Sequence, residues 1–272
     1  MGTFRFKQFE VVNDSSPMKV GTDGVLLGAA ATLYPADSHV LDVGTGTGVI
    51  ALMLAQRLPA LSECINITGI DIDAASAAEA GLNFARSPWA DALEARHCAL
   101  RDFVPAAPLD LIVSNPPYFQ ESLLPPELRR GLARHAAGSA FSFADLADFA
   151  ATHLRRPSPI PSTPASSSAQ HPECESSPSP ICGHLAVILP ADQEVSARRY
   201  AASVGLSVFR ILRIRTTPRK PVSRVILELT LVPSSAAPSE SELTIMDAAS
   251  YPDNKNGYTP DYLALTGDFY LQ

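Results

Sequence analysis

A rigid, donor-poor corner follows an apolar segment near the middle of the chain. The segment LDLIVS at 109–114 leads directly into Asn115, Pro116, Pro117 and Tyr118. Two consecutive prolines stiffen the backbone and remove two N–H donors, and they keep the residue before them out of helical geometry. The corner therefore presents one side-chain amide and one aromatic ring in a fixed frame. Taken alone, the pattern is equally consistent with a structural turn after a strand.

A glycine-rich loop forms a second candidate site. In VLDVGTGTGVIAL at 40–52, an apolar strand ends at Gly44, Gly46 and Gly48, and an apolar helix follows at once. Glycines allow tight turns and a close approach of a ligand to the main chain, and the free N–H groups of a helix N-terminus attract anions. The dinucleotide pattern G-x-G-x-x-G fails because Val49 occupies the third glycine position. The chain also contains no phosphate-binding G-x-x-x-x-G-K-[ST] motif.

The pattern that fits is D-x-G-x-G-x-G, beginning at Asp42, and it resembles the S-adenosylmethionine loop of class I methyltransferases. The resemblance implies glycines under the methionine part of S-adenosylmethionine, with Asp42 holding its ammonium group. It also implies that an acidic residue after the next strand contacts the ribose. Asp71 is favoured for this contact over Asp73, because Asp73 is alternatively the N-cap of the next helix. Asp102, after the third strand, is expected at the adenine, or is a solvated loop residue. The expected cofactor-binding residues are Asp42, Gly44, Thr45, Gly46, Gly48, Asp71, Ile72, Asp102, Phe103, Lys19 and Thr22.

The tetrapeptide at 115–118 resembles motif IV of methyltransferases that modify planar-conjugated nitrogens, such as adenine N6, guanine N2 or a glutamine amide. Such a nitrogen is a poor nucleophile because its lone pair is delocalised. The resemblance implies that the Asn115 side-chain oxygen and the Pro116 carbonyl accept hydrogen bonds from the amine and stabilise its developing charge. Tyr118 would then stack on the target base. The expected catalytic residues are Asn115, Pro116, Pro117 and Tyr118, and no strongly basic residue is required.

Three further segments narrow the resemblance. The stretches FRFKQFEVVNDSSPMKVGTDGVLLGA (4–29), ARHAAGSAFSFADL (133–146) and YTPDYLALTGDFYL (258–271) resemble the bacterial tRNA1(Val) (adenine(37)-N6)-methyltransferases. Those enzymes act on the adenosine just 3′ of the anticodon in a valine tRNA. The implied function is S-adenosylmethionine-dependent methylation of an adenosine N6 in tRNA. The alternatives are a protein-glutamine methyltransferase of release factors, an rRNA guanine-N2 methyltransferase, and a non-catalytic RNA-binding protein on the same fold.

RNA binding needs positive charge, and because the chain carries a net charge of −7, that charge must be concentrated in local patches. One basic group spans 210–224 without an acidic residue, a second follows the motif at 115–118, and Arg5 and Lys7 form a third. Ordinary solvated faces are the alternative for each group. The segment MKVGTDG is expected to lie over the cofactor as a lid, with Lys19, Thr22 and Asp23 as candidates to line it. Thr22 or Asp23 is alternatively an N-cap. The expected RNA-binding residues are Arg129, Arg130, Arg134, His135, Arg210, Arg213, Arg215, Arg219 and Lys220.

Strands and helices alternate along most of the chain. Apolar segments predict strands at 39–44, 65–72, 94–100, 109–114, 184–190, 207–215 and 224–232. Helical periodicity predicts helices at 49–58, 74–87, 143–156, 194–205 and within 258–270. This alternation predicts an α/β fold with a mostly parallel sheet, helices on both faces and a ligand beyond the carboxyl ends of the strands. Combined with the resemblance, it indicates a Rossmann-like class I methyltransferase with a seven-stranded sheet.

One segment breaks the alternation. From 157 to 180, fifteen of twenty-four residues are Pro or Ser. Such a composition cannot bury enough apolar surface to offset the entropy lost on ordering. We therefore expect a single methyltransferase domain over 1–272, with a lid and substrate segment at 1–38 and a disordered Pro/Ser-rich insertion at 157–182.

Composition favours a cytoplasmic protein, because no secretory signal and no run of about 18 apolar residues is present. The four cysteines form no C-x-x-C pair. His171, Cys174, Cys182 and His184 are spaced closely enough to suggest zinc, but the residues between them are not a zinc knuckle, so no metal is expected. The expected partner is tRNA, through its anticodon-loop region, with no membrane and no obligate protein partner.

Overall fold

The computed structural model describes residues 2–17, 19–61, 65–117, 141–157, 182–233, 236–250 and 256–271. Several expected site residues lie outside these ranges, namely Tyr118, Arg129, Arg130, Arg134 and His135. Nearly all of the Pro/Ser-rich segment lies outside them as well, so its expected disorder stays a prediction.

An eight-stranded sheet forms the core, with the order β10-β8-β9-β7-β6-β3-β4-β5. β9 runs antiparallel to both neighbours, and every other neighbouring pair is parallel. The expectation of a mostly parallel sheet is therefore confirmed. In chain order the strands are β3 (His39–Val43), β4 (Asn66–Asp71), β5 (Leu93–His97), β6 (Leu111–Ser114), β7 (His184–Pro190), β8 (Ser207–Arg215), β9 (Arg224–Thr230) and β10 (Ser239–Thr244).

The edge strand β10 corrects the expectation of seven strands. Its sequence, SESELT, lacks apolar alternation, and four of its six residues are exposed. It pairs with β8, and two of its carboxylates contact arginines of that strand, Glu240 with Arg213 at 2.7 Å and Glu242 with Arg215 at 2.5 Å. Because the strand is held by a backbone ladder and ion pairs, hydrophobic periodicity gives no signal for it.

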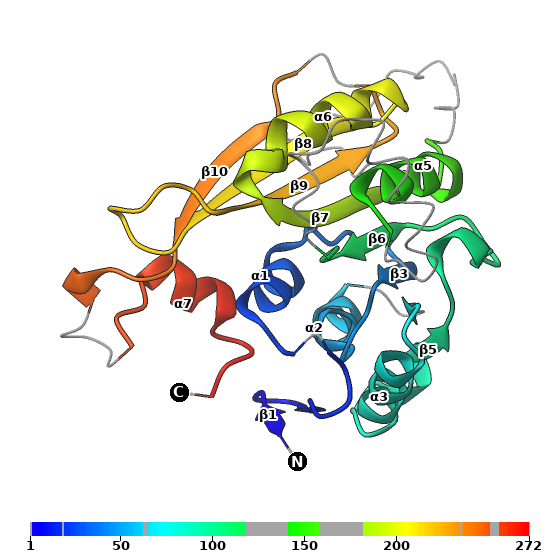
Figure 1. The fold of residues 1–272 in the computed structure, drawn as a ribbon, viewed down its shortest axis with the longest axis horizontal. Helices are drawn as coiled ribbons and strands as arrows, with labels where there is room; N and C mark the ends of the chain where they lie inside the picture. The colour runs from blue at the N-terminus through cyan, green and yellow to red at the C-terminus, as the bar shows by residue number, and fades with distance from the viewer. Residues whose placement is uncertain are drawn as a thin grey trace, which may run out of the picture.

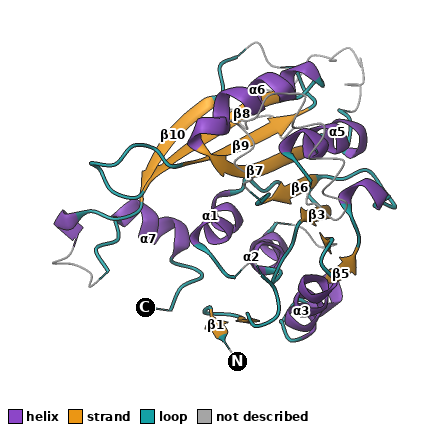
Figure 2. Cartoon of the chain, in the orientation of Figure 1, coloured by secondary structure: helices purple, strands orange, loops and turns teal. Residues whose placement is uncertain are grey.

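Helices cover both faces of the sheet, as expected (Figures 1 and 2). α1 (Thr22–Ala30), α2 (Val49–Arg57) and α3 (Ala74–Ala85) contribute to one hydrophobic cluster, and α5 (Phe143–His153) and α6 (Glu194–Ser203) to a second. Neighbouring residues of β3 alternate between the clusters, with Val40 in the first and Leu41 in the second. Short 3-10 helices lie at Leu58–Ala60, Ala90–Ala92, Leu100–Asp102, Ala191–Gln193 and Ala248–Ser250.

The two ends of the chain pack together beside α1. The N-terminal hairpin consists of β1 (Thr3–Arg5) and β2 (Glu10–Val12), and Phe6, in the connection between these strands, bridges to Tyr270, just after α7 (Pro260–Thr266). The Phe6 ring stacks on Phe9 at 4.5 Å between centroids and on Tyr270 at 6.0 Å. The segments 4–29 and 258–271, remote in sequence, therefore form one structural unit.

The carboxyl ends of the central parallel strands meet at one edge of the sheet. Val43 pairs with Ser114 and with Ile70, and Asp71 pairs with His97. The residues that follow these strands, at 44–48, 71–73, 98–102 and 115–117, consequently converge there, and we call this the carboxyl edge. The opposite side, where β3, β6 and β7 begin, is the amino edge. Among the described residues, no helix is long and apolar enough to cross a membrane.

Candidate active site

The glycine loop at the carboxyl edge has the backbone that its sequence predicts. Gly44, Gly46 and Gly48 have φ angles of 71°, 56° and 82°, which is the left-handed region that favours glycine. A Cβ at Gly48 would lie 2.4 Å from the ring of Phe84, so the loop packs closely against α3. Gly48 is also the N-cap of α2 and provides no side-chain cap, and of the first-turn N–H groups that of Ala51 interacts with Asp42.

Asp42, at the base of this loop, is fully buried. Its Oδ2 accepts a hydrogen bond from Thr45 Oγ1 at 2.7 Å, whereas its Oδ1 has no hydrogen-bond partner. Burial raises the pKa of this carboxyl to about 7, against the lowering effects of the Thr45 hydroxyl and the Ala51 backbone N–H. Gly69 makes room for the arrangement, because a Cβ there would lie 2.7 Å from Thr45 Oγ1. A buried carboxylate with a spare acceptor is suited to a cationic ligand group.

Of the two aspartates considered for the ribose contact, Asp73 is the helix N-cap, and the ribose role of Asp71 stays a prediction. Asp73 is the N-cap of α3, with its Oδ2 accepting from the Ser76 N–H at 2.8 Å. Asp71 accepts from the Gly46 N–H and from the Asp73 N–H, both at 2.9 Å, so it joins the glycine loop to the start of α3. Burial raises the pKa of Asp71. Each of its oxygens accepts a single N–H in this arrangement and retains a second lone pair for a hydroxyl donor.

The remaining expected cofactor residues differ in accessibility. The Asp102 side chain is 65% exposed and lies 3.6 Å from Arg101. The Phe103 ring, in contrast, is buried beside Phe149 with 6.4 Å between ring centroids, so only its backbone is available to a ligand. Ile72 is half-buried, and its carbonyl is 3.0 Å from His97 Nε2.

The Asn115 corner lies beside the glycine loop. Ser114 is buried, and its hydroxyl donates to the Val43 carbonyl at 2.8 Å, which ties the ends of β6 and β3 together. Asn115 and Gly44 are the next residues of these two strands, so they are neighbours. Asn115 is half-buried, Pro116 is buried and Pro117 is half-buried. The chain thus brings a side-chain amide next to the loop that carries Asp42.

Phe141 is a site neighbour that sequence reasoning missed. A Cβ built on Gly44 would lie 3.3 Å from its Cε1, so the ring packs against Gly44 of the glycine loop. It precedes Ser142, which forms a capping box with Asp145 at the start of α5. The sequence signal was this capping box, S-x-x-D, which fixes where the helix begins and therefore which aromatic residue stands just before it.

Comparison with known proteins gives one consistent result. The family model for the methyltransferase small domain matches residues 21–140. The chain is 37% identical over 271 residues to a tRNA1(Val) (adenine(37)-N6)-methyltransferase of Parabacteroides distasonis, covering 99% of this chain and 98% of that protein. It is 35% identical over 272 residues to the protein of the same name from Pseudoalteromonas translucida, covering 100% of both. The chain belongs to the tRNA1(Val) (adenine(37)-N6)-methyltransferase family.

Solved structures independently support the fold of this family member. A crystal structure described as a predicted O-methyltransferase from Agrobacterium tumefaciens aligns with a TM-score of 0.56 at 15% identity, covering 91% of this chain and 96% of that chain. A methyltransferase from Pyrococcus furiosus aligns with a TM-score of 0.52 at 16% identity, covering 81% and 89%. The expectation of a Rossmann-like class I methyltransferase fold is therefore confirmed, with the strand count corrected above.

The basic group at 210–224 divides into paired and exposed members. Arg210 contacts the buried Glu228 at 2.8 Å, and Arg213 contacts both Glu194 and Glu240 at 2.7 Å. Arg215 and Arg224 also have acidic partners, which are Glu242 and Asp23. Arg219 and Lys220 are exposed in the turn between β8 and β9, which lies at the carboxyl edge because Arg224 pairs with Pro190 at the end of β7. Of the expected RNA contacts within this group, these two have the most accessible charge.

The expected lid residues are arranged differently from the expectation. Lys19 Nζ donates to the carbonyls of Asn13 and Asp14, both at 2.9 Å, so its charge is directed at the preceding backbone. Thr22 is exposed and is the first residue of α1, whose N-cap is Gly21, so the alternative of a Thr22 or Asp23 N-cap is wrong. The role of Lys19 and Thr22 towards a cofactor stays a prediction.

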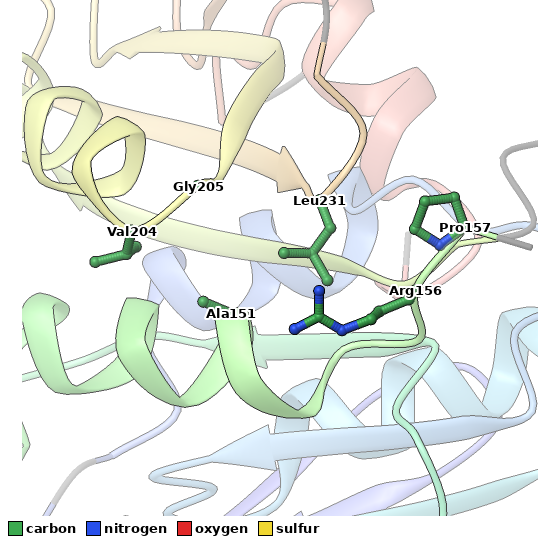
Figure 3. A pocket seen from close by; sticks show the side chains of 6 residues that line it. All are labelled: Ala151, Arg156, Pro157, Val204, Gly205 and Leu231. Atoms are coloured by element: carbon green, nitrogen blue, oxygen red, sulfur yellow. The ribbon is translucent and has the colours of Figure 1, made fainter.

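A pocket of about 430 Å³ lies away from these residues (Figure 3). It lies at the amino edge, because α5 and α6 end there and lead into β7 and β8. The pocket is therefore separate from the candidate active site at the carboxyl edge, where the glycine loop lies beside Asn115. Its lining residues are Ala151, Arg156, Pro157, Val204, Gly205 and Leu231.

The possible zinc ligands do not meet among the described residues. Cys182 is buried with its Sγ 2.9 Å from Thr230 Oγ1, and His184 Nε2 is 3.1 Å from the Thr32 carbonyl. His171 and Cys174 lie outside the described ranges. Within those ranges, no group of three or more potential ligands could hold a metal ion.

Proposed function

We propose that this protein transfers a methyl group from S-adenosylmethionine to N6 of an adenosine in tRNA, and that this adenosine is adenine(37) of tRNA1(Val). The observation that carries the proposal is the meeting of the glycine loop and the Asn115 corner at paired strand ends. The chain in which they meet is similar over its full length to proteins named for this reaction. A cytoplasmic location follows from the proposed substrate.

The residues at the carboxyl edge fit S-adenosylmethionine. The unpartnered Oδ1 of Asp42 offers a buried acceptor for the ammonium group of the methionine part. The glycines of the loop leave space against the main chain that side chains would fill. Asp71 is already oriented by two backbone N–H groups, so its free lone pairs are preorganised for ribose hydroxyls. Asp102, exposed beyond β5, is available for the adenine amine.

The Asn115 corner then performs the chemistry on the acceptor. S-adenosylmethionine, when bound, supplies an electrophilic methyl group on a sulfonium that is a good leaving group. The side-chain oxygen of Asn115 and the carbonyl of Pro116 accept from the two hydrogens of the adenine amine and orient its lone pair. Positive charge that develops on the nitrogen is stabilised by these two acceptors, whose positions are fixed by Pro116 and Pro117 before the reaction begins. Tyr118 stacks on the flipped base.

The RNA contacts are proposed for exposed cations. Arg219 and Lys220 lie at the same edge as Asn115, where they would neutralise phosphates next to the target base. Arg129, Arg130, Arg134 and His135 remain predicted contacts on the segment that follows the motif. For Arg210, Arg213 and Arg215, the acidic partners described above favour a structural role over phosphate binding.

A reconstituted reaction tests the proposal. Purified protein would be incubated with S-adenosylmethionine and an unmodified tRNA1(Val) transcript, and the nucleosides would be quantified by mass spectrometry. We expect N6-methyladenosine from this transcript and none from a matched transcript with guanosine in place of adenine(37). Transfer that persists on the guanosine transcript, or that goes instead to a release-factor glutamine, would contradict the proposed substrate.

A further inference from the structure

Residues 12–16 begin at the last residue of the N-terminal hairpin and lie along α3, and we call them the strap. Glu79 of α3 is buried, and its carboxylate accepts from three consecutive backbone N–H groups of the strap. The distances are 2.8 Å to Asp14, 2.5 Å to Ser15 and 3.1 Å to Ser16. Three donors on one carboxylate offset the cost of burying it. The strap is therefore fixed to the helix by one side chain.

Asn83, one turn further along α3, joins the strap to the glycine loop. It is 1% exposed, and its Oδ1 accepts from the Val12 N–H at 2.8 Å. Its Nδ2 donates to the Val12 carbonyl at 3.0 Å and to the Thr47 carbonyl at 2.9 Å. The amide thus pairs with Val12 as a neighbouring strand would, and its remaining hydrogen holds the loop that carries Gly46 and Gly48.

The strap runs antiparallel to α3 and leads towards the carboxyl edge. Val12 lies at Asn83, whereas the buried Ser16 lies at the first turn, with its Oγ 3.0 Å from Ser76 Oγ. Ser76 in turn lies 2.9 Å from Asp73 Oδ2. The strap therefore ends beside the N-cap of α3, next to the ribose contact proposed for Asp71.

The start of α1 also lies close to the glycine loop. α1 begins at Thr22, and its first turn lies beside the start of α2, since a Cβ at Gly24 would lie 3.3 Å from Val49. Figure 1 shows α2 between α1 and α3. The strap thus ends at the first turn of α3, and α1 begins beside the first turn of α2. Both ends therefore lie close to the glycine loop, which leads into α2 at Gly48.

We propose that Glu79 and Asn83 are positioning residues for the cofactor, which hold the strap and the glycine loop in one arrangement and so form a wall of the S-adenosylmethionine site. This inference rests on the proposed function. Neither side chain touches the reacting atoms. Their effect is on the loop that receives the methionine part, and it therefore appears in cofactor binding, with little change in the step that transfers the methyl group.

Asn83→Asp and Glu79→Gln test the inference. Asn83→Asp keeps the acceptor for Val12 and removes both donated hydrogen bonds, and Glu79→Gln keeps the shape of the side chain while removing its charge. We expect the calorimetric dissociation constant for S-adenosylmethionine to rise at least tenfold in each. The turnover number at saturating cofactor should stay within about threefold, a loss of no more than about 0.7 kcal/mol. Glu79→Gln carries the test if Asn83→Asp does not fold.

Asp110→Asn is the matched control. Asp110 is a buried carboxylate at the amino edge that also accepts from backbone N–H groups, those of Ser38 and His39. We expect it to lower the melting temperature without changing cofactor affinity. If Glu79→Gln and Asn83→Asp also lower only the melting temperature, the two residues are structural and the inference is wrong. Absence of cofactor binding by the unaltered protein would instead contradict the proposed function itself.

Discussion

Two buried aspartates at opposite edges of the same sheet differ in how their charge is satisfied. Asp110, at the amino edge, accepts from the Ser38 N–H, the Ser38 hydroxyl and the His39 N–H, and it forms an ion pair with Arg155. Asp42, at the carboxyl edge, is as deeply buried but, among the described residues, interacts only with the Thr45 hydroxyl and the Ala51 backbone N–H, and its Oδ1 has no hydrogen-bond partner. The two carboxylates are at or near the ends of neighbouring strands, β3 and β6.

The pKa values follow this difference. Burial alone would raise the pKa of Asp110, but the hydrogen bonds from Arg155, His39 and Ser38 outweigh it and lower that pKa. For Asp42, burial dominates, and the pKa rises to about 7. The amino edge therefore uses a carboxylate to hold the fold, while the carboxyl edge retains an acceptor that its own residues do not satisfy. Unsatisfied buried groups of this kind are typical of binding sites.

The largest expected effect is on turnover, and it separates residues of the carboxyl edge that act on the methyl acceptor from those that bind the cofactor. Asn115→Ala removes one preorganised acceptor for the amine, and we expect turnover to fall by about 100-fold or more. Cofactor affinity should change by less than about threefold, because Asn115 is assigned to the acceptor substrate. Single-turnover transfer measured beside calorimetry separates the two effects. If turnover survives, the catalytic role of the corner is wrong.

Asp71→Ala should have the reverse effect. Loss of hydrogen bonds to a charged acceptor costs about 1.5–3 kcal/mol, which corresponds to roughly 10- to 150-fold in affinity for S-adenosylmethionine. The turnover number at saturating cofactor should fall much less. Asp73→Ala is the comparison, since Asp73 caps α3 and should reduce stability more than affinity. Equal losses of affinity in both variants would contradict the assignment of the ribose contact to Asp71.

Stability as a function of pH tests the two aspartates directly. The folded protein holds a proton on Asp42 that the unfolded chain has released, so Asp42 reduces stability progressively as the pH rises from about 4 to 7. We expect cofactor-free Asp42→Asn to melt several degrees higher than the unaltered protein at pH 8, with the gap closing towards pH 4. One kcal/mol corresponds to about 2–4 °C in domains of about this size.

Asp110→Asn should show the opposite sign. The lowered pKa of Asp110 contributes stability above its unfolded pKa, and this contribution is lost as the pH falls through the folded value. The variant should therefore melt lower than the unaltered protein at pH 8, with a difference that shrinks below about pH 4. If Asp42→Asn and Asp110→Asn shifted the melting temperature at pH 8 in the same direction, the proposed difference between the two aspartates would be wrong.

The smallest effect concerns RNA. Arg219→Ser and Lys220→Ser should each raise the KM for tRNA by roughly three- to tenfold and reduce the salt dependence of binding by about one phosphate contact. Arg86→Ser, an exposed cation at the end of α3 on the amino edge, is the control and should have little effect. Filter binding at several salt concentrations measures both quantities. If all three substitutions raised the KM for tRNA equally, the cations would attract RNA only through the overall charge of the protein, and the assignment of Arg219 and Lys220 as RNA contacts would be wrong.

The sequence predicted the parts of the molecule whose signal is local. The glycine loop and the Asn115 corner lie where strand, turn and helix patterns place them, because backbone rigidity and glycine φ angles are encoded within a few residues. Most predicted elements match the structure to within a few residues. The predicted strand 94–100 ends earlier, at His97, because a 3-10 helix begins at Leu100.

What the sequence missed depends on partners far away in the chain. The sequence predicted Arg213 as an RNA contact, but Glu194 and Glu240 neutralise it in the fold. The sequence analysis assigned no role to Glu79 and Asn83, which share one face of an alanine-rich helix with Ser76. In the fold they are buried, and the strap provides their partners. Pattern reading alone cannot identify such a partner.

The most direct measurement is nucleoside mass spectrometry of tRNA1(Val) from cells with and without this protein. We predict that N6-methyladenosine at adenine(37) is lost in cells lacking it, returns when the unaltered protein is supplied, and does not return with Asn115→Ala. Persistence of the modification in cells lacking the protein, or its full return with Asn115→Ala, would contradict the central claim that the corner at the carboxyl edge methylates this adenosine.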